Sequence, residues 1–354
     1  MLDLTRVLAG PLATMTLGDL GADVIKVERP RIGDDTRGWG PPFDARGESA
    51  YFLSVNRNKR SIAADLTRAA DRELVHALAE EADVVMDNFL PSVLEKFGLH
   101  PDEMLARKPA LIWCTITGFG PESERPGYDY VMQAERGWMA ITGPVDGAPT
   151  KVGVALADVI AGKDAAIAVL GALAGRAASR RGGRIFISLA HSASAALVNV
   201  AQNALVSGKE SRRWGNAHPN MVPYEIFEAK DRAIVIAVGS DAQWIACMRA
   251  LGLPQLADDA ALKTNAGRLE ARERIVAAIG ARVRERTAAE WHSALDAAGV
   301  PSGLVKGVLE SLADVEASAL TGVAPQAPGS VRLPPPKLDE HGAEIRAKGW
   351  GAFA

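Results

Sequence analysis

The sequence predicts an α/β fold, in which a large Rossmann-like domain with a parallel sheet is followed by a smaller α+β domain. Three observations lead to this prediction. Short apolar strand patterns alternate with helical patterns over the first 205 residues. The pattern changes near Met221, where two adjacent strand patterns precede three helical ones. The chain has 354 residues, enough for two domains, and its 48% hydrophobic and 23% charged residues are typical of a globular protein.

The first thirty residues predict a strand, a helix and a second strand. Residues 1–4 begin the first strand, and Pro11 suits the first turn of the helix. Residues 24–27 form the second strand, which is followed by Glu28. The turn between the first strand and the helix reads TRVLAGP and lacks the Gly-x-Gly-x-x-Gly of dinucleotide-binding folds. This absence argues against a nicotinamide or flavin cofactor.

The same alternation continues to residue 205 and predicts the rest of the parallel sheet. The expected helices cover residues 69–81, 93–97, 133–141, 159–176 and 193–205, and the expected strands cover residues 83–87, 111–115 and 184–189. Ligands of such sheets bind beyond the carboxyl ends of the strands. We therefore expect Glu28, Asn88 and residues 117–120 to lie near a binding site.

The predicted domain limits follow the changes of pattern. We expect a large α/β domain at residues 1–205, a polar linker at 206–220, a small α+β domain at 221–303, and a segment at 304–354 that returns to the large domain. The small domain is expected to hold strands at 223–227 and 233–237 and helices at 242–251, 266–285 and 288–298. The last segment is expected to form one helix at 308–319 and a proline-rich tail.

Charge and composition exclude several classes of function. A net charge of −3 predicts no nucleic-acid partner. Cys114 and Cys247 are far apart and form no metal-ligand spacing, so we expect a reducing, cytoplasmic location without disulfides. No uninterrupted apolar run is long enough to cross a membrane, and no metal cluster, P-loop or Gly-x-Ser-x-Gly motif is present. We therefore expect no membrane association, no metal and no redox cofactor.

A basic segment follows the second strand and has two interpretations. It contains six cationic side chains within about thirty residues, namely Arg29, Arg31, Arg37, Arg57, Lys59 and Arg60. Such a segment forms either a solvated surface or a patch that binds phosphate groups directly. The density of charge alone does not decide between them.

Asp158 stands between a small apolar stretch, residues 152–157, and the long helical pattern that begins at Val159. Asp is a preferred helix N-cap, and the helix dipole favours a negative charge at that end. The pattern by itself therefore predicts a structural cap. The alternative is a carboxylate that is kept ionised at the start of the helix and acts as a nucleophile.

Several segments resemble the class III coenzyme A transferases, the CaiB/BaiF family, over most of the chain and in the same order. These segments are DLTRVLAGPLATMTLGDLGADVIKVERPRIGDDTR, SVNRNKRSIAADL, DVVMDNFLP, GYDYVMQAERG, VGVALADVIAG, GGRIFISL and WGNAHPNMVPY. The wording of the first and last segments is similar to the branch that moves CoA between dicarboxylates, such as from succinyl-CoA to hydroxymethylglutarate or glutarate.

This resemblance implies a transferase that uses an acyl-CoA and a free carboxylic acid as substrates and no other cofactor. It implies that Asp158 is the nucleophile and forms an aspartyl anhydride and then an aspartyl-CoA thioester. It further implies an interlocked homodimer, in which two ring-like subunits thread through each other. The implied CoA-binding residues are Val7, Ala9, Arg29, Ala64, Asn88, Lys96 and, as a neighbouring basic candidate, Arg125. The implied acyl-pocket residues are Tyr51, Tyr128 and Asp129.

Two other functions remain open on the same resemblance. The α-methylacyl-CoA racemases share the fold but use a histidine as a base where this chain has Tyr128, and a phenol is a poor match for that role. A CoA-binding protein without catalytic activity is the third possibility. The chain also departs from the family pattern at Leu8, where formyl-CoA transferases have glutamine, and at Asp339, where a glycine is usual.

Overall fold

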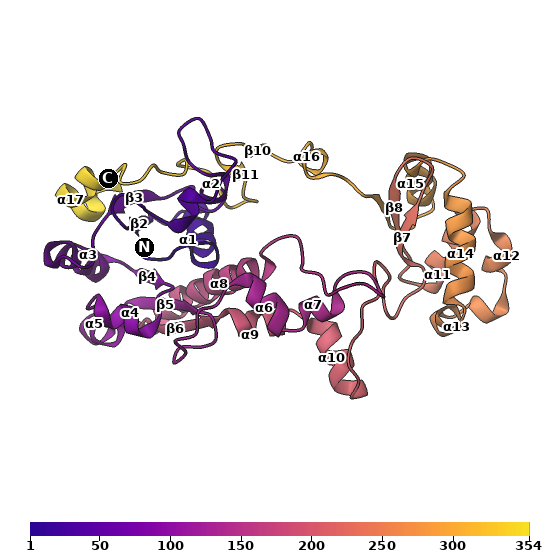
Figure 1. Cartoon of the computed structure of the whole chain (residues 1–354), viewed down its shortest axis with the longest axis horizontal. Helices are drawn as coiled ribbons and strands as arrows, with labels where there is room; N and C mark the ends of the chain where they lie inside the picture. The colour runs from indigo at the N-terminus through magenta and orange to yellow at the C-terminus, as the bar shows by residue number, and fades with distance from the viewer. Residues whose placement is uncertain (354) are drawn as a thin grey trace. The chain divides into compact units, whose positions relative to one another are not determined.

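The computed structural model describes residues 1–353 and divides them into two compact units (Figure 1). Unit 1 contains Met1–Trp138, Lys151–Glu210 and the residues from Val315 onward. Unit 2 contains Met139–Thr150 and Ser211–Asp314. The predicted limits differ from this partition at three segments. Residues 211–220 were expected in the linker and residues 304–314 in the segment that returns to the large domain, but both lie in unit 2. Residues 139–150 were placed in the large domain and also lie in unit 2. In the structure the guanidinium of Arg213 donates hydrogen bonds to the carbonyl oxygens of Pro144 and Gly147, which ties this segment to unit 2.

Unit 1 is built on a six-stranded sheet, and every neighbouring pair of its strands is parallel, which confirms the predicted sheet. The strand order is β3-β2-β1-β4-β5-β6. The strands are β1 (Leu2–Asp3), β2 (Ile25–Glu28), β3 (Arg60–Ala63), β4 (Val84–Asp87), β5 (Ile112–Thr117) and β6 (Gly183–Ser188). The order reverses between β1 and β4, so the loops after these two strands diverge and leave a crevice of the kind in which such sheets bind ligands.

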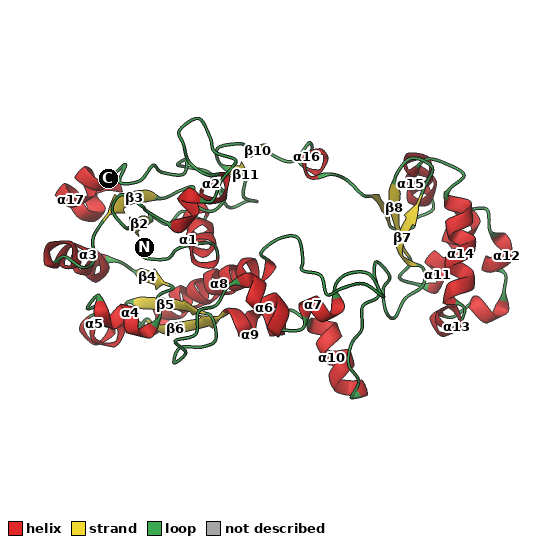
Figure 2. Ribbon diagram, viewed as in Figure 1, coloured by secondary structure: helices red, strands yellow, loops and turns green. Residues whose placement is uncertain are grey.

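Unit 1 has helices on both faces of this sheet and others that lie beside it (Figure 2). They are α1 (Ala9–Asp19), α2 (Ala50–Leu53), α3 (Ala69–Glu81), α4 (Pro91–Lys96), α5 (Pro101–Arg107), α6 (Asp129–Glu135), α8 (Leu156–Ser179), α9 (Leu189–Ala195), α10 (Val198–Ser207) and α17 (Gly342–Lys348), with short 3₁₀ turns at Asp35–Gly38 (η1) and Gly349–Phe353 (η3). One apolar core joins α1 and α8 to the strands, and another joins α3 and α17 to the opposite face.

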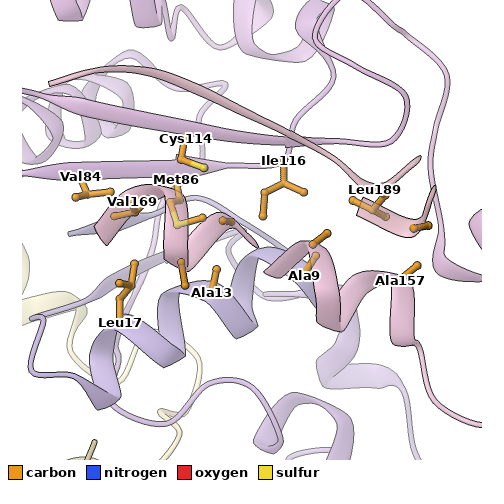
Figure 3. Packing of buried hydrophobic residues seen from close by; sticks show 14 of the residues in the cluster. Ala9, Ala13, Leu17, Val84, Met86, Cys114, Ile116, Ala157, Val169 and Leu189 are labelled. Carbon is orange, nitrogen blue, oxygen red and sulfur yellow. The ribbon is translucent and has the colours of Figure 1, made fainter. Parts of the chain in front are cut away.

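The pair α1 and α8 is packed through small residues (Figure 3). Ala9 and Ala13 of α1 and Ala157 of α8 are buried together below Met86 and Ile116 of the sheet. A Cβ atom at Gly162 would lie 2.6 Å from the carbonyl oxygen of Ala9, so glycine is required where the two helices touch. This close approach brings the first turns of α1 and α8 next to each other.

Four expected helices are divided or shortened in the structure. The helix predicted at 266–285 is two helices, α13 (Asn265–Glu270) and α14 (Arg272–Val283). The helix predicted at 133–141 is two helices, α6 and α7 (Trp138–Ile141), because Gly137 between them has a φ of +84°. The helix predicted at 193–205 is α9 and α10, and α9 begins earlier because the side chain of Ser188 caps it. The helix predicted at 308–319 was wrong beyond α16 (Val308–Ser311), since β10 (Ala317–Ser318) pairs with β11 (Gly322–Val323).

Unit 2 contains a three-stranded antiparallel sheet and helices around one core. Its strands are β7 (Tyr224–Glu228), β8 (Ala233–Ala237) and β9 (Ser302–Leu304), in the order β7-β8-β9. Its helices are α11 (Asp241–Ala250), α12 (Pro254–Ala257), α13 (Asn265–Glu270), α14 (Arg272–Val283) and α15 (Ala288–Ala297), with a 3₁₀ turn at Ala260–Leu262 (η2). Trp244 and Trp291 are fully buried in the core. The two predicted strands are present, and β9 adds a third.

The last forty residues, which are part of unit 1, are held in place by hydrogen bonds to the basic segment that was predicted from the sequence. The side chain of Asn58, which is 1% exposed, accepts hydrogen bonds from the backbone of Arg332 and Leu333 and donates one to Ser330. Arg57 donates to the carbonyl oxygens of Thr321 and Val323. Part of the basic segment therefore holds the end of the chain in place.

Asp339, the departure from the family glycine, lies in the same attached segment. Its φ is +58°, a left-handed conformation that glycine adopts without strain. The aspartate is accommodated because its side chain accepts a hydrogen bond of 2.7 Å from the backbone N–H of Ala63 at the end of β3.

We predict that Asn58→Ala destabilises unit 1 by about 3 kcal/mol, because four hydrogen bonds are lost and buried groups are left unpaired. Alanine is also strained at the φ of +61° that Asn58 adopts. Urea denaturation measures the first effect, and limited proteolysis after residue 315 measures release of the end of the chain. Asn203→Ala, at an exposed position of α10, is the control and should change stability by less than about 0.5 kcal/mol. Equal proteolysis rates in both variants contradict the prediction.

Candidate functional site

The turn between β1 and α1 is held by side chains from outside it. Val7 has a φ of +72°, which is rare for a β-branched residue. Its backbone N–H lies 3.2 and 3.3 Å from the two carboxylate oxygens of Asp34. The amide side chain of Asn88 accepts from the N–H of Arg6 at 3.0 Å and donates to its carbonyl oxygen at 2.7 Å. The unusual backbone is therefore maintained by contacts that fix it from two sides.

A network of fully buried charges lies beneath this turn. Lys59 contacts Asp3 at 3.0 Å, and Lys26 contacts Asp34 at 3.0 Å, with none of the four side chains exposed. Asp3 also accepts from the hydroxyl groups of Thr5 and Thr14. Although burial opposes it, the charges of Lys59 and Lys26 hold the pKa of Asp3 well below its ordinary value. These pairs keep the turn in one conformation, since each buried charge requires its partner.

Asp158 lies inside the first turn of α8 and is not its cap, which corrects the simplest prediction from the sequence. The cap position is Ala155, which has no side-chain hydrogen bond. The backbone N–H of Ala157 instead donates to the carboxylate of Asp129, at 2.8 Å, from the neighbouring helix α6. Asp129 therefore supplies the cap. The carboxylate of Asp158 takes part in no hydrogen bond within residues 1–353.

Gln133, which is fully buried, fixes Asp129 and the strap that leads into α8. Its side-chain amide donates to the second oxygen of Asp129 at 2.7 Å and to the carbonyl oxygen of Val154 at 3.3 Å. Its side-chain oxygen accepts from the N–H of Val152 at 2.8 Å. One amide side chain thus orients the carboxylate that caps α8 and the residues that enter it.

The environment of Asp158 favours its neutral form. The residue is 9% exposed, and burial together with the nearby charge of Asp129 raises its pKa to about 7. Tyr51 lies in the same environment, and burial together with the charges of Asp158, Asp129 and Asp34 raises its pKa to about 12. Asp158 is therefore poised to change protonation state near neutral pH, while Tyr51 stays protonated.

Asp158 is part of the wall of a cavity of about 220 Å³ at the crevice between β1 and β4. The wall also contains backbone and apolar groups from the β1–α1 turn and from the ends of β4 and β5. The other wall residues include Arg6, Val7, Leu8, Ala9, Asn88, Phe89, Val93, Thr117, Gly118, Tyr128 and Leu189. The predicted placement of the segments after β4 and β5 at the binding edge agrees with this wall.

A larger cavity of about 360 Å³ adjoins the first and lies over the ends of β2 and β3. Its wall includes Arg29, Arg31, Ala64 and Thr67. The two cavities share three wall residues, namely Arg6, Phe89 and Val93. The two cavities are therefore neighbours, and the wall of one contains the carboxylate of Asp158 while the wall of the other contains Arg29 and Arg31.

The structure brings together most, but not all, of the residues predicted for the site. Val7, Ala9, Asn88, Tyr128 and Asp158 meet in the smaller cavity, and Arg29 and Ala64 meet in the larger one. Tyr51 and Asp129 line neither cavity. The charge of Asp129 contributes to the raised pKa of Asp158, and the charge of Asp158 contributes to the raised pKa of Tyr51.

Two predicted CoA contacts are not brought to these walls. Lys96 is exposed on α4. Arg125 pairs with Glu135 and stacks over the ring of Phe119 at 4.0 Å. Asn88 reaches the wall, but its amide group is engaged by the backbone of Arg6. Lys96 and Arg125 were predicted by resemblance alone, whereas Asn88 was also expected at the binding edge because it follows a strand of the sheet.

Sequence reasoning missed Arg6, Asp34 and Gln133. Arg6 and Asp34 lie in segments that were singled out, TRVLAGP and GDDTR, so their neighbourhood was a signal. Gln133 gave no signal, because its role depends on contacts with residues about twenty positions away.

The basic segment is mostly not a phosphate patch. Arg37 pairs with Glu28 and Glu48, Arg57 with Asp19, Lys59 with Asp3, and Arg60 with Glu344. With Arg29, which pairs with Asp35, five of the six cations are therefore paired with carboxylates of the protein. Only Arg29 and Arg31 reach the wall of the larger cavity.

The structure bears on two expectations from the sequence, which concern a metal site and a membrane-spanning helix. Within residues 1–353, no group of three or more His, Cys, Asp or Glu side chains is arranged to hold a metal ion. No helix over the same residues is long and apolar enough to cross a membrane. The cytoplasmic location stays a prediction.

Comparison with known proteins places the chain among CoA-transferases. A family model described as CoA-transferase family III matches residues 1–346. The chain is 44% identical to a mouse protein named succinyl-CoA:glutarate CoA-transferase over 322 residues, which cover 90% of this chain and 73% of the mouse protein. It is 39% identical to an Agrobacterium fabrum protein named succinate–glutarate CoA-transferase, covering 98% and 94%. The crystal structure of a CaiB/BaiF family protein from Brucella suis superposes with a TM-score of 0.86 at 41% identity, covering 98% and 97%.

We predict that Asp158→Asn stabilises the protein above pH 7. The raised pKa means that the folded protein keeps this proton to higher pH than the unfolded chain, so stability falls as pH rises from about 4 to about 7. The shift from 3.8 to about 7 corresponds to at most about 4 kcal/mol. Urea denaturation of both proteins at pH 5 and pH 8.5 should show a difference that grows with pH. An equal difference at the two pH values contradicts the raised pKa.

Proposed function

The chain belongs to CoA-transferase family III, and on this basis we propose that it moves CoA from an acyl-CoA donor to a free carboxylic acid with Asp158 as the nucleophile. The observation that carries the proposal is the carboxylate of Asp158. It lies in the wall of a cavity at the switch point of the sheet, and its helix is capped by Asp129. A carboxylate that is free of hydrogen-bond donors keeps its lone pairs for attack.

The proposed reaction proceeds by exchange at carbonyl groups and needs no redox step. An oxygen of Asp158 attacks the thioester carbon of the donor, the C–S bond breaks, and CoA leaves as a thiolate. The thiolate attacks the aspartyl carbonyl of the mixed anhydride and releases the donor acid, which leaves an aspartyl-CoA thioester. The acceptor carboxylate attacks this thioester, and the thiolate then attacks the acceptor carbonyl. The new acyl-CoA departs and Asp158 is restored.

Three features of the site support this chemistry. The attack requires ionised Asp158, and a pKa of about 7 leaves a large fraction ionised near neutral pH while keeping the group more basic than an ordinary carboxylate. The burial of Asp158 limits access of water, which would hydrolyse the anhydride. Asp158 lies in the first turn of α8, where the helix dipole favours a negative charge on the carboxylate and on a developing oxyanion.

The two adjoining cavities support a direction for bound CoA. The thiol end would lie in the smaller cavity beside Asp158, along Val7 and Ala9. The nucleotide would lie in the larger cavity, near Arg29 and Ala64. The chain between them would pass Arg6, which lines both cavities. Guanidinium groups bind phosphates directly, which fits this direction.

The names of the relatives support a dicarboxylate as the acceptor. The mouse and Agrobacterium proteins are both named for transfer of CoA between succinate and glutarate. We therefore propose succinyl-CoA as the donor and a dicarboxylic acid of similar length as the acceptor. No feature of the site favours the racemase alternative, since Tyr128, at the position of the racemase base, is 53% exposed.

We predict that incubation with succinyl-CoA and hydroxylamine forms a hydroxamate on Asp158, because hydroxylamine traps both acyl intermediates. Mass spectrometry of the digested protein measures it, together with CoA exchange into glutarate. Asp158→Asn should lose both signals. Asp164→Asn is the matched control, since this residue lies on the same helix and its carboxylate bonds Ser192 at 2.6 Å. Full CoA exchange by Asp158→Asn overturns the proposal, and exchange of an α-proton with deuterium identifies a racemase instead.

We further propose that the protein forms a homodimer, and the interlocked arrangement of the family is the form that we expect. The support is an uncovered apolar surface on unit 1. No residue of α10 is buried, and Val198, Leu205 and Val206 are 69%, 77% and 78% exposed. Ile167 on α8 is 67% exposed. Large apolar side chains that stay in contact with water are typical of surfaces covered by another chain.

We predict a dimeric mass for the protein in sedimentation-velocity experiments at micromolar concentration. The double variant Leu205→Glu/Val206→Glu should shift the mass toward the monomer, because charges would be buried in the interface. A monomeric mass for the unmodified protein contradicts the dimer. An unchanged dimer in the double variant excludes α10 from the interface.

A further inference from the structure

One carboxylate is shared by two arginines at the junction of the two cavities. Nη1 of Arg6 lies 3.2 Å from one oxygen of Asp35, and Nη2 of Arg29 donates to the other oxygen. Arg6 lines both cavities and Arg29 lines the larger one. Nε of Arg6 is buried and has no hydrogen-bond partner in the described part of the chain. Two cationic groups and a spare donor therefore converge where the cavities meet.

The two neighbouring aspartates, Asp34 and Asp35, differ sharply in what they do. Asp34 is buried, pairs with Lys26, caps the 3₁₀ turn η1 and accepts the N–H of Val7. The side chain of Asp35 is 37% exposed, and its partners among residues 1–353 are Arg6 and Arg29. Asp34 is thus needed to hold the turn, whereas Asp35 serves the two arginines alone.

We propose that Asp35 is an internal counter-anion that occupies the position taken by the diphosphate of CoA. In the empty protein its carboxylate neutralises Arg6 and Arg29 and holds them close together. When CoA binds, the diphosphate oxygens replace the carboxylate between the two guanidinium groups. This inference rests on the proposed function, because it assumes that CoA is the ligand.

Geometry and charge favour the diphosphate over the other groups of CoA. The diphosphate joins the pantetheine arm to the adenosine, so it must pass the junction if the thiol reaches Asp158 and the nucleotide fills the larger cavity. A diphosphate offers more negative charge and more acceptor oxygens than one carboxylate, so it can bind the two guanidinium groups together. Exposed ion pairs are weak, so the exchange costs little.

Exchange of one anion for another has a consequence for affinity. Binding of CoA must first break two ion pairs made by Asp35, and the displaced carboxylate stays near the phosphates and repels them. Removing its charge should therefore tighten binding. If Asp35 instead served only to orient the arginines, its removal would weaken binding. The two roles of Asp35 therefore predict opposite changes in the affinity for CoA when its charge is removed.

The test compares the dissociation constants of the unmodified protein and Asp35→Asn by isothermal titration calorimetry. We expect CoA and dephospho-CoA, which both contain the diphosphate, to bind about three- to tenfold more tightly to the variant, since two exposed ion pairs no longer compete. Pantetheine, which lacks the diphosphate, should bind both proteins equally. Tightening seen with CoA but not with dephospho-CoA assigns Asp35 to the 3′-phosphate and overturns the diphosphate assignment.

Two further variants separate the outcomes. Asp23→Asn removes another exposed carboxylate that pairs with an arginine, Arg332, and should leave CoA binding unchanged. Arg6→Ala should weaken CoA binding and abolish most of the gain from Asp35→Asn, which a double-mutant cycle measures. Equal or weaker CoA binding by Asp35→Asn overturns the inference alone. Failure of the unmodified protein to bind CoA overturns both the inference and the proposed function.

Discussion

The buried charges beneath the β1–α1 turn are the constraint on which the rest of the site depends. Asp3 with Lys59 and Asp34 with Lys26 are removed from water, so each charge must keep its partner. Loss of one partner from such a pair typically costs about 3–5 kcal/mol. This requirement holds Val7 in its left-handed conformation and places the backbone of residues 6–9 along the cavity. The cavity wall is therefore set before any ligand binds.

The separation of two roles between Asp129 and Asp158 gives the site its chemistry. The side-chain oxygens of an aspartate at the start of a helix ordinarily accept hydrogen bonds from backbone N–H groups. Here Asp129 takes that task from another helix and is itself held by Gln133. Asp158 is left buried and without donors, next to a second negative charge, so its pKa rises. The same arrangement that makes ionised Asp158 unfavourable for stability supports the nucleophilic role that we propose for it.

The cationic side chains of the basic segment have different structural roles. Arg57 and Asn58 attach the end of the chain, while Lys59 balances a buried carboxylate. Arg29 and Arg6 remain at the junction of the cavities with only the exposed Asp35 between them. The distribution follows from the positions of the acidic partners, one of which, Glu344, is 284 residues away from Arg60 in the chain. Charge density in the sequence carries no information about these partners.

Local patterns in the sequence were enough to predict the parallel sheet, most of its strands and helices, and the family, because these depend on periodicity and on runs of ordered motifs. They missed β3, whose polar residues hide its strand pattern, and β9, and they placed Asp158 at the cap. Only the tertiary structure decided that Asp129 caps α8 and that most of the basic segment is internally paired. Capping and charge pairing are set by distances between segments far apart in sequence, and such distances exist only after the chain has folded.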